Sequence, residues 1–271
     1  MAIITISRGS YSRGKEIAEK VAVRLGYECV AREALLEASE HFDIPEAKLI
    51  RAVHDAPSIL DRFAHGKEKY VAYIQAALTR YVQKDGVVYH GLAGHFLLQG
   101  ISHVLKVRIT AAIDDRVQVV MERDNVDEKE ALRILHQDDE QRKSWSHYLY
   151  GIDTTDPSLY DLMLCIEKIS VDGAVDIICS AVGAQSFRTT AQSQKTLDDL
   201  VLACEVRSHL IVMKPDVEVE ADDGVVLIRM AVPMPRQDAV TREITNVAQS
   251  LPGVKEVHVE MSAASLYDSE D

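Results

Sequence analysis

The chain has 271 residues and a mass of 30.1 kDa, which fits one large domain or two modest ones. Hydrophobic residues make up 47% of it, enough for a sizeable core, and no apolar run is long enough to cross a membrane. The net charge is −13, of which residues 191–271 carry −8 and residues 1–190 carry −5. Neither part has the positive excess that nucleic acid or anionic lipid demands, so we expect neither as a partner.

The four cysteines predict a reducing environment. Cys29, Cys165, Cys179 and Cys204 form no CxxC pair, and no histidine cluster completes a zinc pattern. Each lies among apolar neighbours, which predicts buried free thiols in the cytoplasm. The opening segment "AIITIS" has no basic flank and no cleavable apolar stretch, so we expect no secretory signal.

The first candidate site is a glycine-rich loop between a strand pattern at 2–7 and a helical stripe at 15–25. It reads Gly9-x-x-x-x-Gly14-Lys15, the spacing of a phosphate-binding loop. Glycines let backbone amides point inward, and the helix that follows adds the positive end of its dipole. We therefore predict that nucleotide phosphates bind to Gly9, Ser10, Tyr11, Ser12, Arg13, Gly14, Lys15 and Glu16.

The charges around this loop suit a phosphorylated ligand. Lys15 can reach the outer phosphates, and Arg8 and Arg13 add positive charge to an otherwise acidic chain. Glu16 stands where a hydroxyl usually binds Mg²⁺, but a carboxylate is also a hard oxygen ligand, so Glu16 is a candidate metal ligand. The alternative is an ordinary Gly/Ser turn in which Lys15 and Arg13 are merely solvated.

The remaining patterns alternate strands and helices up to residue 182. Helical patterns cover 33–84, 114–123, 127–147 and 171–182, with strands at 86–90, 105–109 and 162–166. This alternation predicts an α/β fold, with a parallel sheet covered by helices on both faces. We place a first domain at 1–182 and a polar linker at 183–195.

A second, smaller domain is predicted at 196–262, followed by an acidic tail at 263–271. Its patterns run in the order helix (197–210), two strands, helix (236–250) and strand (254–259). The two strands flank Asp222-Asp223-Gly224, which is typical of a hairpin turn. About 65 residues suffice for an independent α+β domain of αββαβ order.

Five segments resemble the cytidylate kinase-like family, a bacterial branch of the P-loop nucleoside monophosphate kinases. Residues 7–18 follow its loop motif S-R-x-x-G-S-G-G-R-E-I-A, in which the glutamate at position 16 is normal and an arginine is usual where Lys15 stands. The resemblance spans about residues 1–182. Its other four segments are "YECVARE" (27–33, with Ala31 in place of Asp), "AAIDDRVQVVMERDNVDEKEA" (111–131), "DDEQRKSWSHYLYG" (138–151) and "DPSLYDLML" (156–164).

This resemblance implies transfer of the γ-phosphoryl group of ATP, with Mg²⁺, to a nucleoside monophosphate such as CMP or dCMP. Lys15 and the loop amides would hold the donor, while Arg116, Arg123 and Arg142 would stabilise the moving charge. Arg32, Asp139 and Arg142 would position the acceptor. From the residues alone, the arginines at 116, 123 and 142 are equally well explained as helix-surface ion pairs with Asp114, Glu122 or Asp139.

One departure from the family leaves two further interpretations open. Its motif G-R-x-A-D reads Gly91-Leu92-Ala93-Gly94-His95 here, and leucine cannot replace the bidentate phosphate recognition of arginine. Either the acceptor differs from CMP, or the protein binds nucleotide as a regulator without catalysis. A structural adaptor with a vestigial loop is a third possibility.

His90 and His95 could form a metal pair, but histidines satisfied within a loop are the favoured interpretation.

The second domain resembles a BON domain, a small αββαβ module. "LPGVKEVHVEM" (251–261) is similar to its closing G-V-x-x-V pattern, and "DGVVL" (223–227) to its D-G-x-V-x-L hairpin. The resemblance implies binding of a small ligand or a protein partner. A stability or self-association module is the alternative, which we favour slightly.

Overall fold

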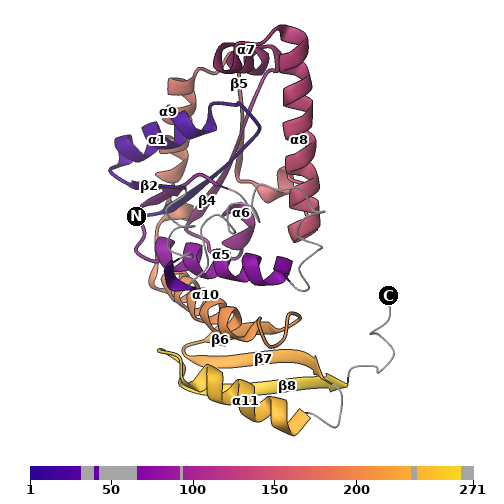
Figure 1. Cartoon of the computed structure of the whole chain (residues 1–271). Coiled ribbons are helices and arrows are strands. Elements are labelled where there is room, and N and C mark those ends of the chain that lie inside the picture. Colours follow the sequence, from indigo (N-terminus) through magenta and orange to yellow (C-terminus); the bar gives the residue numbers. More distant parts are fainter. Residues whose placement is uncertain (32–39, 43–65, 92–93, 233–236, 264–271) are drawn as a thin grey trace.

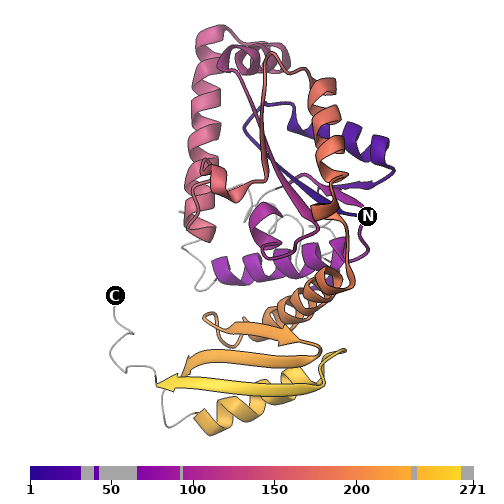
Figure 2. The same ribbon diagram turned by 180° about the vertical axis from the view of Figure 1, so that it is seen from behind.

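The computed structural model describes residues 1–31, 40–42, 66–91, 94–232 and 237–263. Arg32, Leu92 and the acidic tail after residue 263 therefore lie outside the described residues. Two sheets organise the chain (Figures 1 and 2). The elements of the first are β1 (Ile3–Arg8), α1 (Gly14–Leu25), β2 (Glu28–Val30), α5 (Gly66–Val82), β3 (Val87–Tyr89), α6 (Gly94–Leu97), β4 (Val104–Ala111), α7 (Ile113–Asp124), α8 (Glu128–Tyr150), β5 (Leu162–Ile166) and α9 (Val171–Val182).

The first sheet has five parallel strands in the order β2-β3-β1-β4-β5. Its central strand β1 is buried on both faces: Ile4 and Ile6 pack with α1 and α9, whereas Ile3 packs with α5 and α6. A strand buried on both sides needs an almost continuous apolar run, and "IITI" supplies one. The predicted α/β class, with helices on both faces of a parallel sheet, is confirmed.

The strand patterns at 86–90, 105–109 and 162–166 become β3, β4 and β5. Strand β2 was not predicted, because three residues are too few for a periodic signal. The cysteine prediction was partly wrong: Cys204 is buried, but Cys165 is exposed and Cys29 and Cys179 are intermediate. Cys165 lies on β5, whose side chains alternate, and this one faces outward.

The second sheet confirms the predicted αββαβ order. Strands β6 and β7 are antiparallel and β8 is parallel to β7, while α10 and α11 bury the apolar face of the sheet. Asp223 and Gly224 form the hairpin turn with φ of 48° and 85°, the left-handed region that such turns require. The elements are α10 (Ala191–Leu210), β6 (Glu218–Asp222), β7 (Val225–Val232), α11 (Gln237–Gln249) and β8 (Glu256–Ala263).

Helix α10 begins inside the segment that was predicted as a linker. Thr190 accepts a hydrogen bond from the amide of Ser193, and the Ser193 hydroxyl accepts one from the amide of Thr190. This reciprocal capping fixes the start of the helix six residues before the predicted residue 197. The Thr-x-x-Ser spacing was the signal that the sequence offered.

The two sheets are joined through helices α5 and α10, which lie side by side between them (Figures 1 and 2). Leu197 of α10 is buried in the core under the first sheet. Conversely, Ala72 and Tyr73 of α5 belong to the core of the second sheet, and Arg80 of α5 pairs with Glu205 of α10. The second unit is therefore packed against the first and not tethered by a loose segment. Within the described residues, no helix is long and apolar enough to span a bilayer.

Leu197→Ala should lower the free energy of unfolding by about 2–5 kcal/mol, because it leaves a cavity in the core of the first unit. Both units should then unfold in one transition at a lower midpoint in urea, followed by circular dichroism. Val212→Ala is the control, since Val212 is 61% exposed and its truncation should change stability by less than about 0.5 kcal/mol. Two separate transitions would contradict the shared core.

Candidate functional site

The glycine-rich loop between β1 and α1 is fastened to the neighbouring strand β4. The amide of Gly9 donates to the carbonyl of Ile109 at 2.9 Å. The hydroxyl of Ser12 donates to the carbonyls of Gly9 at 2.9 Å and Ile109 at 3.1 Å. The Ser12 side chain is thus buried, and it ties the loop to β4.

The backbone amides of the loop are available to a ligand. In the part of the chain that the structure describes, no hydrogen bond leaves the amides of residues 10–16. Ser10, Ser12 and Gly14 are nevertheless buried, and buried amides without an acceptor are rare in proteins. These seven donors end at the first turn of α1, so the helix dipole adds to their partial positive charge. Such an arrangement can bind an anion.

The backbone of the loop is strained at two residues that are not glycine. Tyr11 and Arg13 have φ of 57° and 60°, which costs roughly 1 kcal/mol or more for a residue other than glycine. Both stand where the family motif has glycine. Gly14 is required for a different reason, because a Cβ there would lie 2.7 Å from Cβ of Arg8. The concave loop shape is therefore kept despite unfavourable side chains.

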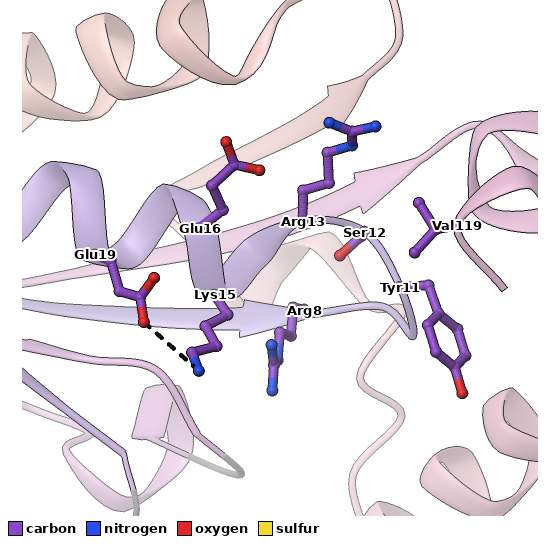
Figure 3. A pocket seen from close by; sticks show the side chains of 8 residues that line it. All are labelled: Arg8, Tyr11, Ser12, Arg13, Lys15, Glu16, Glu19 and Val119. Atoms are coloured by element: carbon purple, nitrogen blue, oxygen red, sulfur yellow. Dashed lines mark ion pairs between the residues drawn. The ribbon is translucent and has the colours of Figure 1, made fainter. Parts of the chain in front are cut away.

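A pocket of about 310 Å³ lies over this loop (Figure 3). Lys15 points toward Glu19, and its Nζ lies 3.6 Å from the carboxylate. Glu16 is paired with Lys20, one turn further along α1, at 3.3 Å. The pocket is lined by Arg8, Tyr11, Ser12, Arg13, Lys15, Glu16, Glu19 and Val119.

Helices α7 and α8 each meet the backbone of the loop with one arginine side chain. Arg116 donates from Nε to the Ser10 carbonyl at 2.7 Å, and from Nη2 to both oxygens of Asp139 at 2.7 Å. Arg142 approaches the carbonyl of Arg8 at 3.5 Å and has no carboxylate partner among the described residues. Burial, and then the charge of Arg142, lower the pKa of Arg8, so positive charge is concentrated here.

Arg123 is placed differently. Its guanidinium is paired with Asp124 and lies 4.6 Å from the ring centroid of Tyr11. The Tyr11 hydroxyl in turn donates to Asp138 of α8 at 2.8 Å. Tyr11 therefore joins the loop to both helices, a contact for which the sequence carries no signal.

The structure brings together most of the predicted site residues. Tyr11, Ser12, Arg13, Lys15 and Glu16 line one pocket, and Arg116 and Arg142 contact backbone carbonyls beside it. Asp139 is engaged by Arg116. No group of three or more His, Cys, Asp or Glu side chains with metal-binding geometry exists within the described ranges. A magnesium ion beside Glu16 would therefore take its other ligands from phosphate and water, as this ion commonly does.

A sequence model described as the cytidylate kinase-like family matches residues 3–168, more than half of the chain. The protein belongs to the cytidylate kinase-like family. This match contains the loop, α7, α8 and every site residue predicted above, so the pocket lies in the part that defines family membership.

Individual relatives of this family member match only part of its chain, at about one third sequence identity. The cytidylate kinase of Staphylothermus marinus is 34% identical over 90 residues, which cover 32% of this chain and 50% of that protein. That of Methanocaldococcus jannaschii is 33% identical over 104 residues, covering 37% and 58%. The chain spans about half the length of the curated relatives it matches. An uncharacterized protein from Eubacterium ventriosum has the same fold, with a TM-score of 0.53, 24% identity, and coverage of 68% of this chain and all of its own.

Ser12→Ala should lower the free energy of unfolding by about 1–2 kcal/mol, because it removes the hydroxyl that ties the loop to Ile109. Ser10→Ala is the matched control: its buried hydroxyl has no partner, so its loss should leave stability unchanged or raise it. Urea denaturation measures both. Equal destabilisation by the two variants would contradict the proposed tie.

Proposed function

We propose that this cytidylate kinase-like protein transfers the γ-phosphoryl group of ATP to a nucleoside monophosphate such as CMP or dCMP. The observation that carries the proposal is the row of seven unpaired amides at residues 10–16, beside a concentration of arginine side chains. Family membership gives the class of reaction. An oxygen of the acceptor phosphate attacks the γ-phosphorus, the bond to the bridging oxygen breaks, and ADP leaves with that oxygen.

The donor phosphates occupy the loop in this proposal. The amides of residues 10–16 bind the phosphate oxygens, and Lys15 leaves Glu19 to reach the outermost phosphate. That exchange costs little, because an exposed ion pair such as Lys15–Glu19 contributes only about 0–1 kcal/mol. The Lys15 side chain is long and largely exposed, so its ammonium group can make this movement.

Charge on the moving group is stabilised by Arg116 and Arg142. Arg116 is held in position at both ends of its guanidinium, by the Ser10 carbonyl and by Asp139, so it is oriented before the ligand arrives. We therefore assign Asp139 the positioning of Arg116 and not contact with the acceptor. Arg123 supports Tyr11 from outside the pocket. Arg142, which lacks a carboxylate partner among described residues, can also contact the moving phosphoryl group directly.

Mg²⁺ would neutralise the donor phosphates when bound, and Glu16 is the protein side chain that we propose to contact it. Glu16 stands in the first turn of α1 and is about half exposed, so its carboxylate can exchange Lys20 for another cation. A single carboxylate together with phosphate oxygens fits the preference of Mg²⁺ for few protein ligands.

Lys15→Ala should reduce turnover by at least a hundredfold, because it removes charge stabilisation that no other lysine of the pocket supplies. The assay is ATP-dependent phosphorylation of a panel of ribo- and deoxyribonucleoside monophosphates. Lys84→Ala is the control, since Lys84 pairs with Glu28 at the far edge of the sheet. Unchanged activity in Lys15→Ala would refute the assigned role.

The second candidate is a regulator that binds nucleotide without phosphoryl transfer, with the BON-like domain as its interaction module. Leu92 in place of the family arginine favours it. Both candidates predict that ATP with Mg²⁺ raises the melting temperature, with about 2.7 kcal/mol of stabilisation at one hundred times Kd. They differ in product: ADP formation with any monophosphate supports the kinase, and none across the panel supports the regulator. Absence of a thermal shift would exclude both and leave the adaptor.

A further inference from the structure

A second group of polar side chains lies on the opposite face of the sheet from α1. Along β1, Ile4 and Ile6 face α1, so Ser7 faces the side of α5 and α6. On β4, Val107 and Ile109 also face α1, and Arg108 therefore lies on the same side as Ser7. Both stand toward the carboxyl ends of their strands, where open α/β sheets bind ligands.

Within the described residues, the Arg108 guanidinium of this group hydrogen-bonds only to hydroxyl groups. Its Nη1 lies 3.3 Å from the Ser7 hydroxyl and 3.2 Å from the hydroxyl of Tyr160. Its guanidinium lies 5.5 Å from the centroid of the Tyr160 ring. No carboxylate pairs with it among the residues described, although the chain has 43 Asp and Glu. A half-buried guanidinium without an acidic partner retains donors for an anionic ligand.

His95 completes the group. It is 4% exposed, its ring centroid lies 4.9 Å from that of Tyr160, and neither ring nitrogen has a hydrogen-bond partner. Burial, followed by the charges of Arg108 and Lys106, lowers the pKa of His95 to about 4. The ring is therefore neutral at pH 7 and offers one N–H donor and one acceptor. A buried polar ring without partners is costly unless a ligand satisfies it.

The backbone around His95 is built to place it here. A Cβ at Gly94 would lie 2.5 Å from the ring of Tyr89, and one at Gly91 would lie 2.2 Å from the Tyr89 hydroxyl. Glycine at both positions lets the chain pass over Tyr89 and bring α6 onto the sheet. Burial alone does not define the site, because His103 is also buried without partners at the amino end of β4, away from Arg108.

We propose that Ser7, His95, Arg108 and Tyr160 form the acceptor subsite, in which Arg108 binds an anionic oxygen and His95 hydrogen-bonds an uncharged polar group of the same molecule. Ser7 lies two residues before Gly9, where the proposed donor loop begins, so an acceptor here lies next to the donor phosphates. Arg108 thus supplies the guanidinium that Leu92 removes from the family motif. Calling this group an acceptor subsite rests on the proposed phosphoryl transfer, but binding of a monophosphate to it can be tested without catalysis.

Isothermal titration of the full chain with CMP, dCMP, UMP, AMP and GMP, and separately with a non-hydrolysable ATP analogue, tests the proposal. Arg108→Met and His95→Phe should each weaken monophosphate binding about tenfold or more, because each removes a buried hydrogen-bonding group. Binding of the ATP analogue should change less than twofold. His103→Phe is the matched control and should alter neither affinity.

The outcomes separate this inference from the proposed kinase activity. Monophosphate affinity unchanged in both variants, or no monophosphate binding by the wild type, overturns the subsite. Wild-type binding that both variants weaken, without ADP production, supports the subsite and refutes the kinase. If thermal unfolding shows that Arg108→Met is not folded, Arg108→Lys and Tyr160→Phe take its place: weaker monophosphate binding with unchanged binding of the ATP analogue supports the subsite, and unchanged affinity for both overturns it.

Discussion

The carbonyl of Ile109 is the fixed point on which the candidate site depends. It accepts hydrogen bonds from the amide of Gly9 and the hydroxyl of Ser12, the two ends of the turn that follows β1. The remaining amides of the loop, at residues 10–16, donate no hydrogen bond within the described residues. The parallel pairing of β1 with β4 supplies this geometry, because it sets the two strand ends side by side. The conformation of the loop is thus set by the sheet.

Helices α7 and α8 contact the same loop through its carbonyl groups and through the side chain of Tyr11. Arg116 and Arg142 contact the carbonyls of Ser10 and Arg8, and Tyr11 reaches Asp138. The carbonyls of the loop therefore bind the two helices, whereas its amides at residues 10–16 keep no acceptor among the described residues. The positions of the loop backbone and of α7 and α8 are therefore fixed by the same contacts.

The C-terminal unit is coupled to the same framework through α5. One face of α5 packs under the first sheet, with Leu78 beside Leu197, while Ala72 and Tyr73 pack under the second sheet. A helix shared by two cores is held in place from both sides, because protein interiors are close-packed. The second unit is therefore in direct packing contact with the helices that cover the first sheet.

The sequence by itself determined the local features. The apolar run of β1, the Gly9–Gly14–Lys15 spacing and the αββαβ order of the second unit were all predicted, because each depends on neighbours within a few residues. Only the tertiary structure decided that Asp139 serves Arg116, that Tyr11 reaches Asp138, and that His95 meets Tyr160. These contacts join residues 23, 127 and 65 positions apart, and no local periodicity encodes which distant side chains a folded sheet brings together.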